Sequence, residues 1–242
     1  MNDEPKIIFE AETESSVRMW FGDSIDEKIL WRISAINDSL HHAPFPGFVE
    51  SVPAYTTLTI FYDPMIVGAS SMGAGRYSFE LVIDYLKTYS DKIQPSSKQQ
   101  GEKLIQIPVC YGGRTGPDIE EVARYNKLGI KDLIRFHAER VYTVYMVGFL
   151  PGFPYLGGMN EKLATPRRLN PRNLVPAGSV GIAGAQTGIY PLDSPGGWQL
   201  IGRTPMRLFD PMSGSPALLS AGNRIRFSPI TYEEYQYLSS DQ

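Results

Sequence analysis

The segment from Gly148 to Arg203 constrains the fold of this chain more than any other part of the sequence. Its 56 residues contain 11 of the chain's 23 glycines and 7 of its 19 prolines. Glycine reaches backbone conformations that are closed to other residues, whereas proline fixes φ and removes a hydrogen-bond donor. Aromatic and aliphatic residues are interleaved with them, and a disordered linker would lack these. The segment therefore predicts short strands joined by tight turns.

The same segment is positively charged although the chain as a whole is acidic. Five basic residues face two acidic ones, a local charge of +3, whereas the formal net charge of the chain is −3. Arginines on stiff loops suit bidentate recognition of a carboxylate or a phosphate group. The alternative is a set of solvated or ion-paired surface arginines. The charged residues are Lys162, Arg167, Arg168, Arg172, Arg203, Glu161 and Asp193.

Composition places the chain among soluble globular proteins. Hydrophobic residues make up 42% and charged residues 20%, which is ordinary for that class. A pI near 5.7 argues against general nucleic-acid binding, which normally requires a basic domain. The N-terminus lacks a signal-peptide pattern, and no run approaches the roughly 18 apolar residues of a membrane span. We therefore expect a cytoplasmic protein with no nucleic-acid or membrane partner.

The first third of the chain predicts a small α/β domain with helices on one face of a short sheet. A capping box at Ser24–Glu27 predicts the start of the first helix. Residues 66–75 are small and glycine-rich, which predicts a loop. The polar residues 91–103 predict a linker, so the expected domains are 1–90 and 104–242. The predicted strands are 6–9, 17–21, 48–52 and 56–63, and the predicted helices are 24–41 and 77–89.

The last part of the chain predicts a closed or nearly closed β-barrel, because short strands alternate with glycine and proline turns. Residues 141–147 are apolar on both faces and predict a central strand. Gly116 and Pro117 predict the start of a helix that ends at Gly129, and a second helix is predicted over 131–139. Further strands are predicted at 104–109, 207–209 and 224–227.

Cys110 is the only cysteine in the chain. An internal disulfide framework is therefore excluded, and a reducing compartment is indicated. Because Cys110 follows an apolar strand pattern, a buried structural cysteine is favoured over a nucleophile.

Several catalytic motifs are absent from the sequence. It contains no G-x-x-x-x-G-K-[ST] loop, no G-x-S-x-G elbow and no H-E-x-x-H motif. Two of its three histidines, His41 and His42, are adjacent and do not make a metal site by themselves. If the chain takes part in catalysis, we expect a partner to supply part of the site.

His137 is the first candidate for a functional residue. It lies at the end of a predicted helix, shortly before the predicted strand 141–147 and the GFLPGF loop. A histidine titrates near neutral pH and could therefore act in acid–base catalysis. The alternative is a helix-end histidine that makes a local hydrogen bond.

Two polar clusters are the other candidates. Gln186, Thr187 and Tyr190 offer an amide, a hydroxyl and a phenol, which could orient an amide-like or carboxylate ligand. The alternative is a strand whose polar groups satisfy turn backbones. Ser194, Gly196 and Gly197 could expose backbone N–H groups as an anion nest, or form an ordinary turn. The arginines that could complement either cluster are Arg167, Arg168 and Arg203.

Long motifs in the chain resemble the KipI/PxpB family, also called allophanate hydrolase subunit 1 or the first half of a biotin-dependent carboxyltransferase domain. The motifs are GFLPGFPYLGGM and PRRLNPRNLVPAGSVGIAGAQTGIYPLDSPGGWQLIGRTP. IPVCYGG and GPDIEEVA upstream and LFDP downstream extend the resemblance, and the N-terminal third matches more loosely. One departure is visible, because the family usually has an acidic residue after YGG and this chain has Arg114.

The resemblance implies an α+β protein of two domains, a small N-terminal α/β domain followed by a cyclophilin-like β-barrel. It also implies the B subunit of an ATP-dependent 5-oxoprolinase, which opens 5-oxo-L-proline to L-glutamate together with the C and A subunits. The sequence does not show which of the three binds ATP. Because this substrate carries a carboxylate and an amide, we assign His137, Gln186 and Tyr190 to catalysis and the remaining candidates to substrate or anion binding.

The same resemblance implies a second function, which is protein binding without chemistry. KipI inhibits a sensor histidine kinase that controls sporulation, and its cyclophilin-like domain would bind the helical dimerisation region of that kinase. An exposed apolar surface over the loops would support this function, whereas arginines in a concave site would support the enzyme. A weaker third possibility is a partner in biotin chemistry, with biotin carried by another chain.

Overall fold

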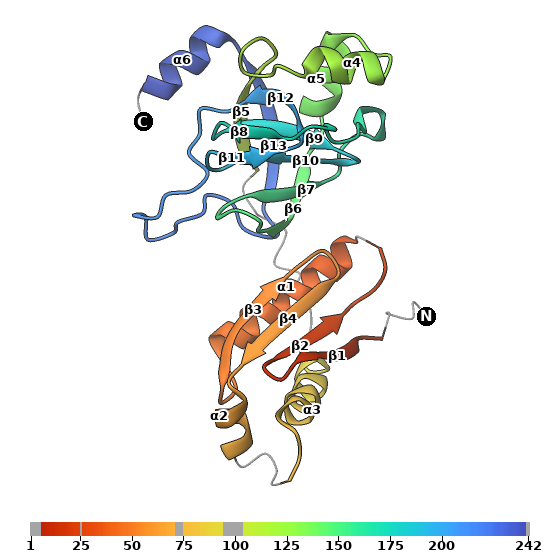
Figure 1. The fold of residues 1–242 in the computed structure, drawn as a ribbon, viewed down its shortest axis with the longest axis vertical. Helices are drawn as coiled ribbons and strands as arrows, with labels where there is room; N and C mark the ends of the chain where they lie inside the picture. The colour runs from red at the N-terminus through yellow and green to blue at the C-terminus, as the bar shows by residue number, and fades with distance from the viewer. Residues whose placement is uncertain (1–5, 25, 71–74, 94–103, 241–242) are drawn as a thin grey trace. The chain divides into compact units, whose positions relative to one another are not determined.

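The computed structural model describes residues 6–24, 26–70, 75–93 and 104–240. The chain divides into two compact units, one within residues 1–101 and the other within 102–242 (Figure 1). Most of the predicted linker, residues 94–103, lies outside the described residues. The exact domain boundaries therefore stay a prediction. The likeness of the second unit to cyclophilin also stays a prediction.

The first unit contains a four-stranded antiparallel sheet. Its strand order is β1-β2-β4-β3. The alternation of Leu58, Ile60 and Tyr62 buries one face of β4, as the period of two in a strand requires. The strands are β1 (Ile8–Thr13), β2 (Ser16–Trp20), β3 (Phe48–Pro53) and β4 (Thr57–Tyr62).

Two long helices, α1 (Glu27–His42) and α3 (Ser78–Ser90), contribute buried side chains to the same core as this sheet. They therefore cover one face of it, as the sequence predicts. The predicted cap of α1 at Ser24 is wrong. Asp26 caps the helix instead, because its carboxylate accepts a hydrogen bond of 2.6 Å from the backbone N–H of Lys28.

The predicted loop over 66–75 is wrong in its first part. Residues Pro64–Ala69 form a short helix, α2. The carboxylate of Asp63 accepts hydrogen bonds from the backbone N–H groups of Met65 and Ile66 at 2.8 and 3.2 Å. This capping, with proline at the first helical position, explains why a glycine-containing segment forms a helix here.

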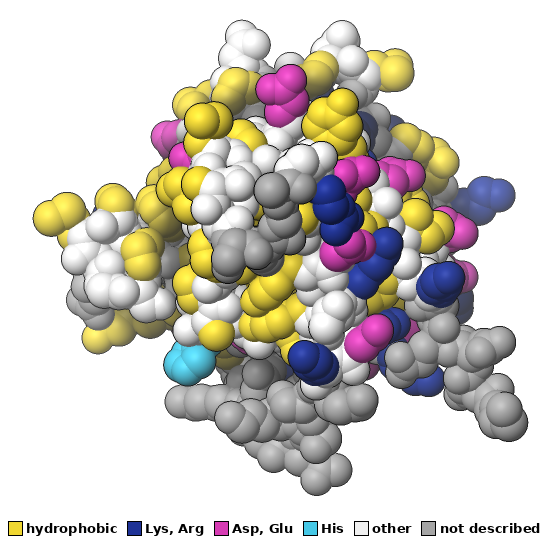
Figure 2. Space-filling model, turned by 90° about the horizontal axis from the view of Figure 1, so that it is seen from below, with side chains coloured by type: hydrophobic (Ala, Val, Ile, Leu, Met, Phe, Trp, Pro, Cys, Tyr) yellow, Lys and Arg dark blue, Asp and Glu magenta, His cyan; other side chains and the backbone are white. Residues whose placement is uncertain are grey.

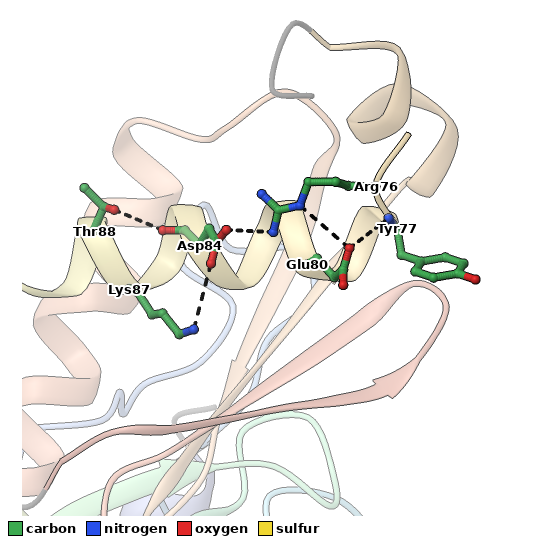
Figure 3. Close-up of polar contacts among 6 residues, drawn as sticks. All are labelled: Arg76, Tyr77, Glu80, Asp84, Lys87 and Thr88. Carbon is green, nitrogen blue, oxygen red and sulfur yellow. Dashed lines mark hydrogen bonds and ion pairs between the residues drawn. The ribbon is translucent and has the colours of Figure 1, made fainter. Parts of the chain in front are cut away.

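Local polar contacts fix the start of α3 at the protein surface (Figure 3). The Glu80 carboxylate accepts a hydrogen bond of 3.2 Å from the backbone N–H of Tyr77. Arg76 donates to Asp84 at 2.7 Å, which holds the pKa of that carboxyl below its usual value. Figure 2 shows hydrophobic side chains beside charged side chains of both signs on the face seen from below. Basic and acidic side chains are intermingled among the described residues drawn in that view.

The second unit is built on a closed barrel of seven strands, which confirms the predicted barrel (Figure 1). The strand order is β10-β7-β6-β13-β5-β12-β9. Only the pairing of β13 with β5 is parallel. The strands are β5 (Ile105–Tyr111), β6 (Tyr142–Val147), β7 (Pro154–Gly157), β9 (Ser179–Ala183), β10 (Gln186–Ile189), β12 (Gln199–Arg203) and β13 (Arg224–Ile230).

A two-stranded sheet accompanies the barrel. Strand β8 (Arg172–Val175) pairs with β11 (Ser194–Gly196), and Gly196 lies opposite Arg172. The prediction of a nest or an ordinary turn at Ser194–Gly197 is therefore wrong for its first three residues. The segment 148–203 nevertheless consists of short strands, as its composition predicts.

Helices α4 (Ile119–Tyr125) and α5 (Ile130–Ala138) differ from the predicted helices mainly in their boundaries. Asp118, not Gly116 or Pro117, precedes the first turn of α4, and Gly129 lies at the start of α5. The predicted strand 207–209 is wrong, since only Phe209 makes an isolated bridge, to Ala217. Helix α6 (Tyr232–Ser240) was not predicted, because it buries none of its side chains and so has no apolar face in the sequence.

Candidate functional site

An aromatic cavity in the second unit brings several predicted site residues together. Its volume is about 150 Å³. It lies where the loop after β6, strand β7, the loop before β8 and the residue after β10 meet the end of β11 and the turn that follows it. The residues that line it are Phe149, Phe153, Tyr155, Arg167, Tyr190, Gly196, Gly197 and Trp198.

Phe153 is the centre of the aromatic packing around this cavity. Its ring centroid lies 4.9 Å from that of Tyr155, 5.2 Å from that of Tyr190 and 5.5 Å from that of Trp198. The contacts with Tyr190 and Trp198 are edge-to-face, a geometry that aromatic pairs prefer. Because Phe153 is fully buried, it holds the other rings in fixed positions and gives the cavity rigid walls.

Gly196 sets the available space beside Tyr190. A Cβ atom on residue 196 would lie 2.5 Å from the Tyr190 hydroxyl oxygen, closer than non-bonded atoms approach. Glycine is therefore required at this position if the phenol is to keep its place. Tyr190, Gly196 and Gly197, which belong to two separate predicted clusters, therefore line one cavity, and Gly196 leaves the room that Tyr190 occupies.

Phe149 forms an exposed wall of the cavity in an unusual backbone conformation. Its φ angle is +69°, a region that residues other than glycine adopt only at a cost. Its ring meets that of Phe153 edge-to-face, with centroids 5.8 Å apart, and the residue is 68% exposed. Such strain is concentrated at ligand sites, and here it presents an aromatic ring to the cavity mouth.

Arg167 is the cation of this cavity. It is exposed, and it makes no hydrogen bond or ion pair with any other residue that the structure describes. Burial raises the pKa of both the Tyr155 and the Tyr190 phenol, and the positive charge of Arg167 offsets part of each rise. An arginine whose donors are unused beside an aromatic cavity can bind a carboxylate in a bidentate manner.

The Tyr190 phenol keeps its proton at neutral pH. Burial raises its pKa, while the backbone of Trp198 and the charges of Arg167 and Arg172 act in the opposite direction. The phenol can therefore donate a hydrogen bond to a ligand oxygen, and nearby positive charge would stabilise negative charge that develops on that oxygen.

The structure separates Arg168 from Arg167. Arg168 donates to Oδ1 of Asp118 at 2.9 Å, and Arg172 donates to the same oxygen at 2.6 Å. The other carboxylate oxygen of Asp118 accepts a hydrogen bond of 2.7 Å from the backbone N–H of Leu200. Asp118 is only 4% exposed. Arg168 is therefore a structural residue in this geometry, and its predicted role in binding substrate is not supported by its position.

Sequence reasoning missed Asp118 as a residue that supports the site. The Asp118 carboxylate links the segment that carries Arg167 to strand β12, because it accepts hydrogen bonds from both Arg168 and the backbone N–H of Leu200. Its position directly after Pro117 at a helix start marks it only as a possible capping residue. Its pairing with arginines 50 and 54 positions away leaves no local pattern in the sequence.

His137 and Thr187 are buried in the interior of the second unit, and neither of them lines the aromatic cavity. The hydroxyl of Tyr111 lies 2.7 Å from Nδ1 of His137, and that of Thr187 lies 3.0 Å from Nε2. Because the Thr187 hydroxyl donates to the carbonyl of Gly181, Nε2 carries the proton that His137 donates. Burial lowers the pKa of His137 to about 3, so the expected titration near neutral pH is wrong.

The remaining predicted residues are dispersed. Gln186 is half-buried on β10, opposite Ala183. Ser194 is buried, and its hydroxyl has no hydrogen-bond partner among the described residues. Arg203 lines a different cavity and donates from Nε to the carbonyl of Ala177 at 2.7 Å. Cys110 is buried, as expected, at the edge of a third cavity of about 440 Å³ that Arg114 also lines.

The described part of the chain contains no cluster of histidine, cysteine or acidic residues that could hold a metal ion. Among the same residues, no helix is long and apolar enough to cross a membrane.

Comparison with known proteins places the chain among well-defined relatives. Residues 8–219 match the family model of the carboxyltransferase domain, subdomain C and D. The 5-oxoprolinase B subunit of Bacillus subtilis is 44% identical over 222 residues, which cover 92% of each chain. The 5-oxoprolinase B subunit of Haemophilus influenzae is 46% identical over 179 residues, which cover 74% of this chain and 78% of the relative.

A solved structure extends the likeness to three dimensions. A conserved uncharacterised protein from Pyrococcus horikoshii is 43% identical to this chain, with a TM-score of 0.55. The match covers 94% of this chain and 100% of that one.

Proposed function

This chain belongs to the family of the carboxyltransferase domain, subdomain C and D, and on that premise we propose that it is the B subunit of an ATP-dependent 5-oxoprolinase. The reaction opens the lactam of 5-oxo-L-proline to L-glutamate and is coupled to ATP hydrolysis. Relatives named as the B subunit of 5-oxoprolinase at 44% and 46% identity support this proposal. The C and A subunits of that enzyme are the proposed partners.

The unpaired Arg167 at the aromatic cavity is the observation that carries the proposal. The substrate is a small ring with one carboxylate and one amide carbonyl. A cavity of about 150 Å³ is smaller than the roughly 300–1,000 Å³ of sites for drug-sized ligands, which suits a ring of this size. The Arg167 guanidinium would bind the carboxylate, and the rings of Phe153 and Trp198 would contact the apolar part of the ligand.

Tyr190 has the chemistry to act on the amide. Its protonated phenol would donate a hydrogen bond to the lactam oxygen, which gains negative charge when the carbonyl carbon is attacked. The positive charges of Arg167 and Arg172, which already act on Tyr190, would stabilise that charge. ATP would bind outside the aromatic cavity, because this cavity is too small for a nucleotide and is lined by one arginine.

Partner subunits would dock near the same segment. Leu169 is 98% exposed, and Leu174 on β8 is also exposed. These two leucines lie close to Arg168 and Arg172 in the sequence, in the segment that carries Arg167. A partner that covers them would also cover the aromatic cavity and exclude water from it. Kinase inhibition by a KipI-type contact would use the same surface. The named relatives favour the role in the enzyme.

Reconstitution tests the proposed function. The chain would be mixed with its two expected partner subunits, and glutamate release from 5-oxoproline and ATP would be measured. ATP-dependent glutamate that disappears when this chain is omitted supports the proposal. A verified complex of three subunits that releases no glutamate contradicts it, and binding to a sensor histidine kinase would then be measured instead.

A further inference from the structure

A second cavity in the second unit carries positive charge without a carboxylate in its lining. Its volume is about 240 Å³, and it lies between the end of β12, the following loop, the turn at residues 177–178 and helix α6. Two arginines, Arg203 and Arg207, contribute to its walls, and none of the described residues that line it is aspartate or glutamate. A concave surface lined by two arginines and by no carboxylate favours an anionic ligand.

Arg203 is held in place but is not neutralised. Its backbone lies in β12 opposite Ser179 and Cys110, and its Nε donates to the carbonyl of Ala177 at 2.7 Å. Among the described residues, no carboxylate lies within ion-pair distance of its guanidinium, and its two terminal nitrogens have no hydrogen-bond acceptor. This half-buried arginine is therefore oriented and has donors available for a ligand.

Arg207 and Thr204 add further donors. Nε of Arg207 donates to the carbonyl of Phe209 at 3.3 Å. Its Nη2 lies 3.4 Å from Oδ1 of Asp210, in an exposed ion pair that is long for a charge-assisted hydrogen bond. A doubly charged ligand can compete for such an arginine. The Thr204 hydroxyl accepts a hydrogen bond of 3.2 Å from the backbone N–H of Met206, so its own proton is free to be donated.

We propose that this cavity binds a phosphate group. Phosphate has several acceptor oxygens and carries about −1.5 to −2 charges near pH 7, which matches two guanidinium groups and one hydroxyl better than a monovalent carboxylate does. The phosphate would come either from a nucleotide or from inorganic phosphate. This inference goes beyond the proposed function and does not depend on it.

The site is separate from the aromatic cavity but lies next to it along the chain. Tyr190 lines the aromatic cavity, and Pro191 lines the second one. The backbone carbonyl of Tyr190 accepts a hydrogen bond of 2.7 Å from the N–H of Gly178, which also lines the second cavity. A ligand in one cavity would therefore contact the same turn that positions the phenol in the other.

Titration calorimetry on the whole chain at low salt tests the proposal, with inorganic phosphate in one series and ATP in another. Arg203→Gln combined with Arg207→Gln is expected to weaken binding about tenfold or more. Arg224→Gln, at an exposed arginine on β13, is the matched control and should bind like the unmodified chain. Thermal unfolding of each variant would confirm that it is folded.

The outcomes separate the possible ligands from failure of the proposal. If the unmodified chain binds both inorganic phosphate and ATP and the double variant binds neither, the site accepts a free phosphate group. If the unmodified chain binds only ATP and the double variant does not, the site is specific for a nucleotide. Absence of binding in the unmodified chain at millimolar ligand overturns the proposal. Binding that survives in the double variant also overturns the proposal. Binding that is lost only in Arg167→Gln overturns it as well, because the phosphate would then be bound in the aromatic cavity.

Discussion

Gly196 and Tyr190 fit together so closely that a single added carbon would separate them. A Cβ atom on residue 196 would lie 2.5 Å from the hydroxyl oxygen of Tyr190. The phenol keeps its position in the aromatic cavity only because residue 196 has no side chain. This contact joins strand β11 to the residue that follows β10, and it makes the cavity sensitive to very small changes.

Gly196→Ala is therefore expected to reduce glutamate release by the reconstituted complex about tenfold or more, because the Tyr190 phenol must move away from its position. The change is measured as kcat/KM for 5-oxoproline. Gly214→Ala is the matched control, since a Cβ there meets nothing within 4 Å, and it should leave the rate unchanged. Equal rates for the two variants would show that the placement of Tyr190 is irrelevant to the reaction.

Arg167→Lys is expected to raise KM for 5-oxoproline about tenfold with a smaller effect on kcat. Lysine keeps the positive charge but loses the planar fork that binds a carboxylate in a bidentate manner. Arg167→Gln should raise KM further, since it also removes the charge. An unchanged KM in both variants, with the complex assembled, would exclude Arg167 from substrate binding.

Asp118→Asn is expected to destabilise the second unit by about 2 kcal/mol, because Arg168 and Arg172 then lose the charge that both of them bind. Removing one partner from a fully buried ion pair costs roughly 3–5 kcal/mol, and the partial exposure of the two arginines reduces this value. Urea unfolding measures the change. Asp132→Asn breaks the exposed ion pair with Arg135 and should have little effect. Similar stabilities for the two variants would contradict the role given to Asp118.

The burial of His137 predicts how stability depends on pH. Its pKa is about 3 in the folded chain and near 6.5 when unfolded, so the unfolded chain binds more protons between these values. The contribution of His137 to the free energy of unfolding is fully present above pH 6.5. It is lost as the pH falls toward 3, at up to about 1.4 kcal/mol per pH unit. Urea unfolding across this range should give a shallower pH dependence for His137→Gln. The same slope in both chains would show that His137 is not buried as a neutral ring.

The sequence by itself determined the kinds of elements and the family. Glycine and proline density in residues 148–203 predicted short strands and a barrel, because these residues restrict the backbone locally whatever surrounds them. Apolar periodicity located α1 and α3 for a similar reason, since the repeat of a helix is a local property, and a continuous apolar run located β6. Helix α6 lacks such a repeat and was missed.

Only the tertiary structure decided which candidate residues meet. Arg167 and Arg168 are adjacent in the sequence, yet one reaches the aromatic cavity and the other binds Asp118, 50 positions earlier. His137 and Tyr190 both looked suited to catalysis, but burial makes the histidine a neutral core residue. Burial and charge pairing depend on distances between segments that are far apart in the chain. Closure of the barrel sets those distances, and local sequence patterns do not encode them.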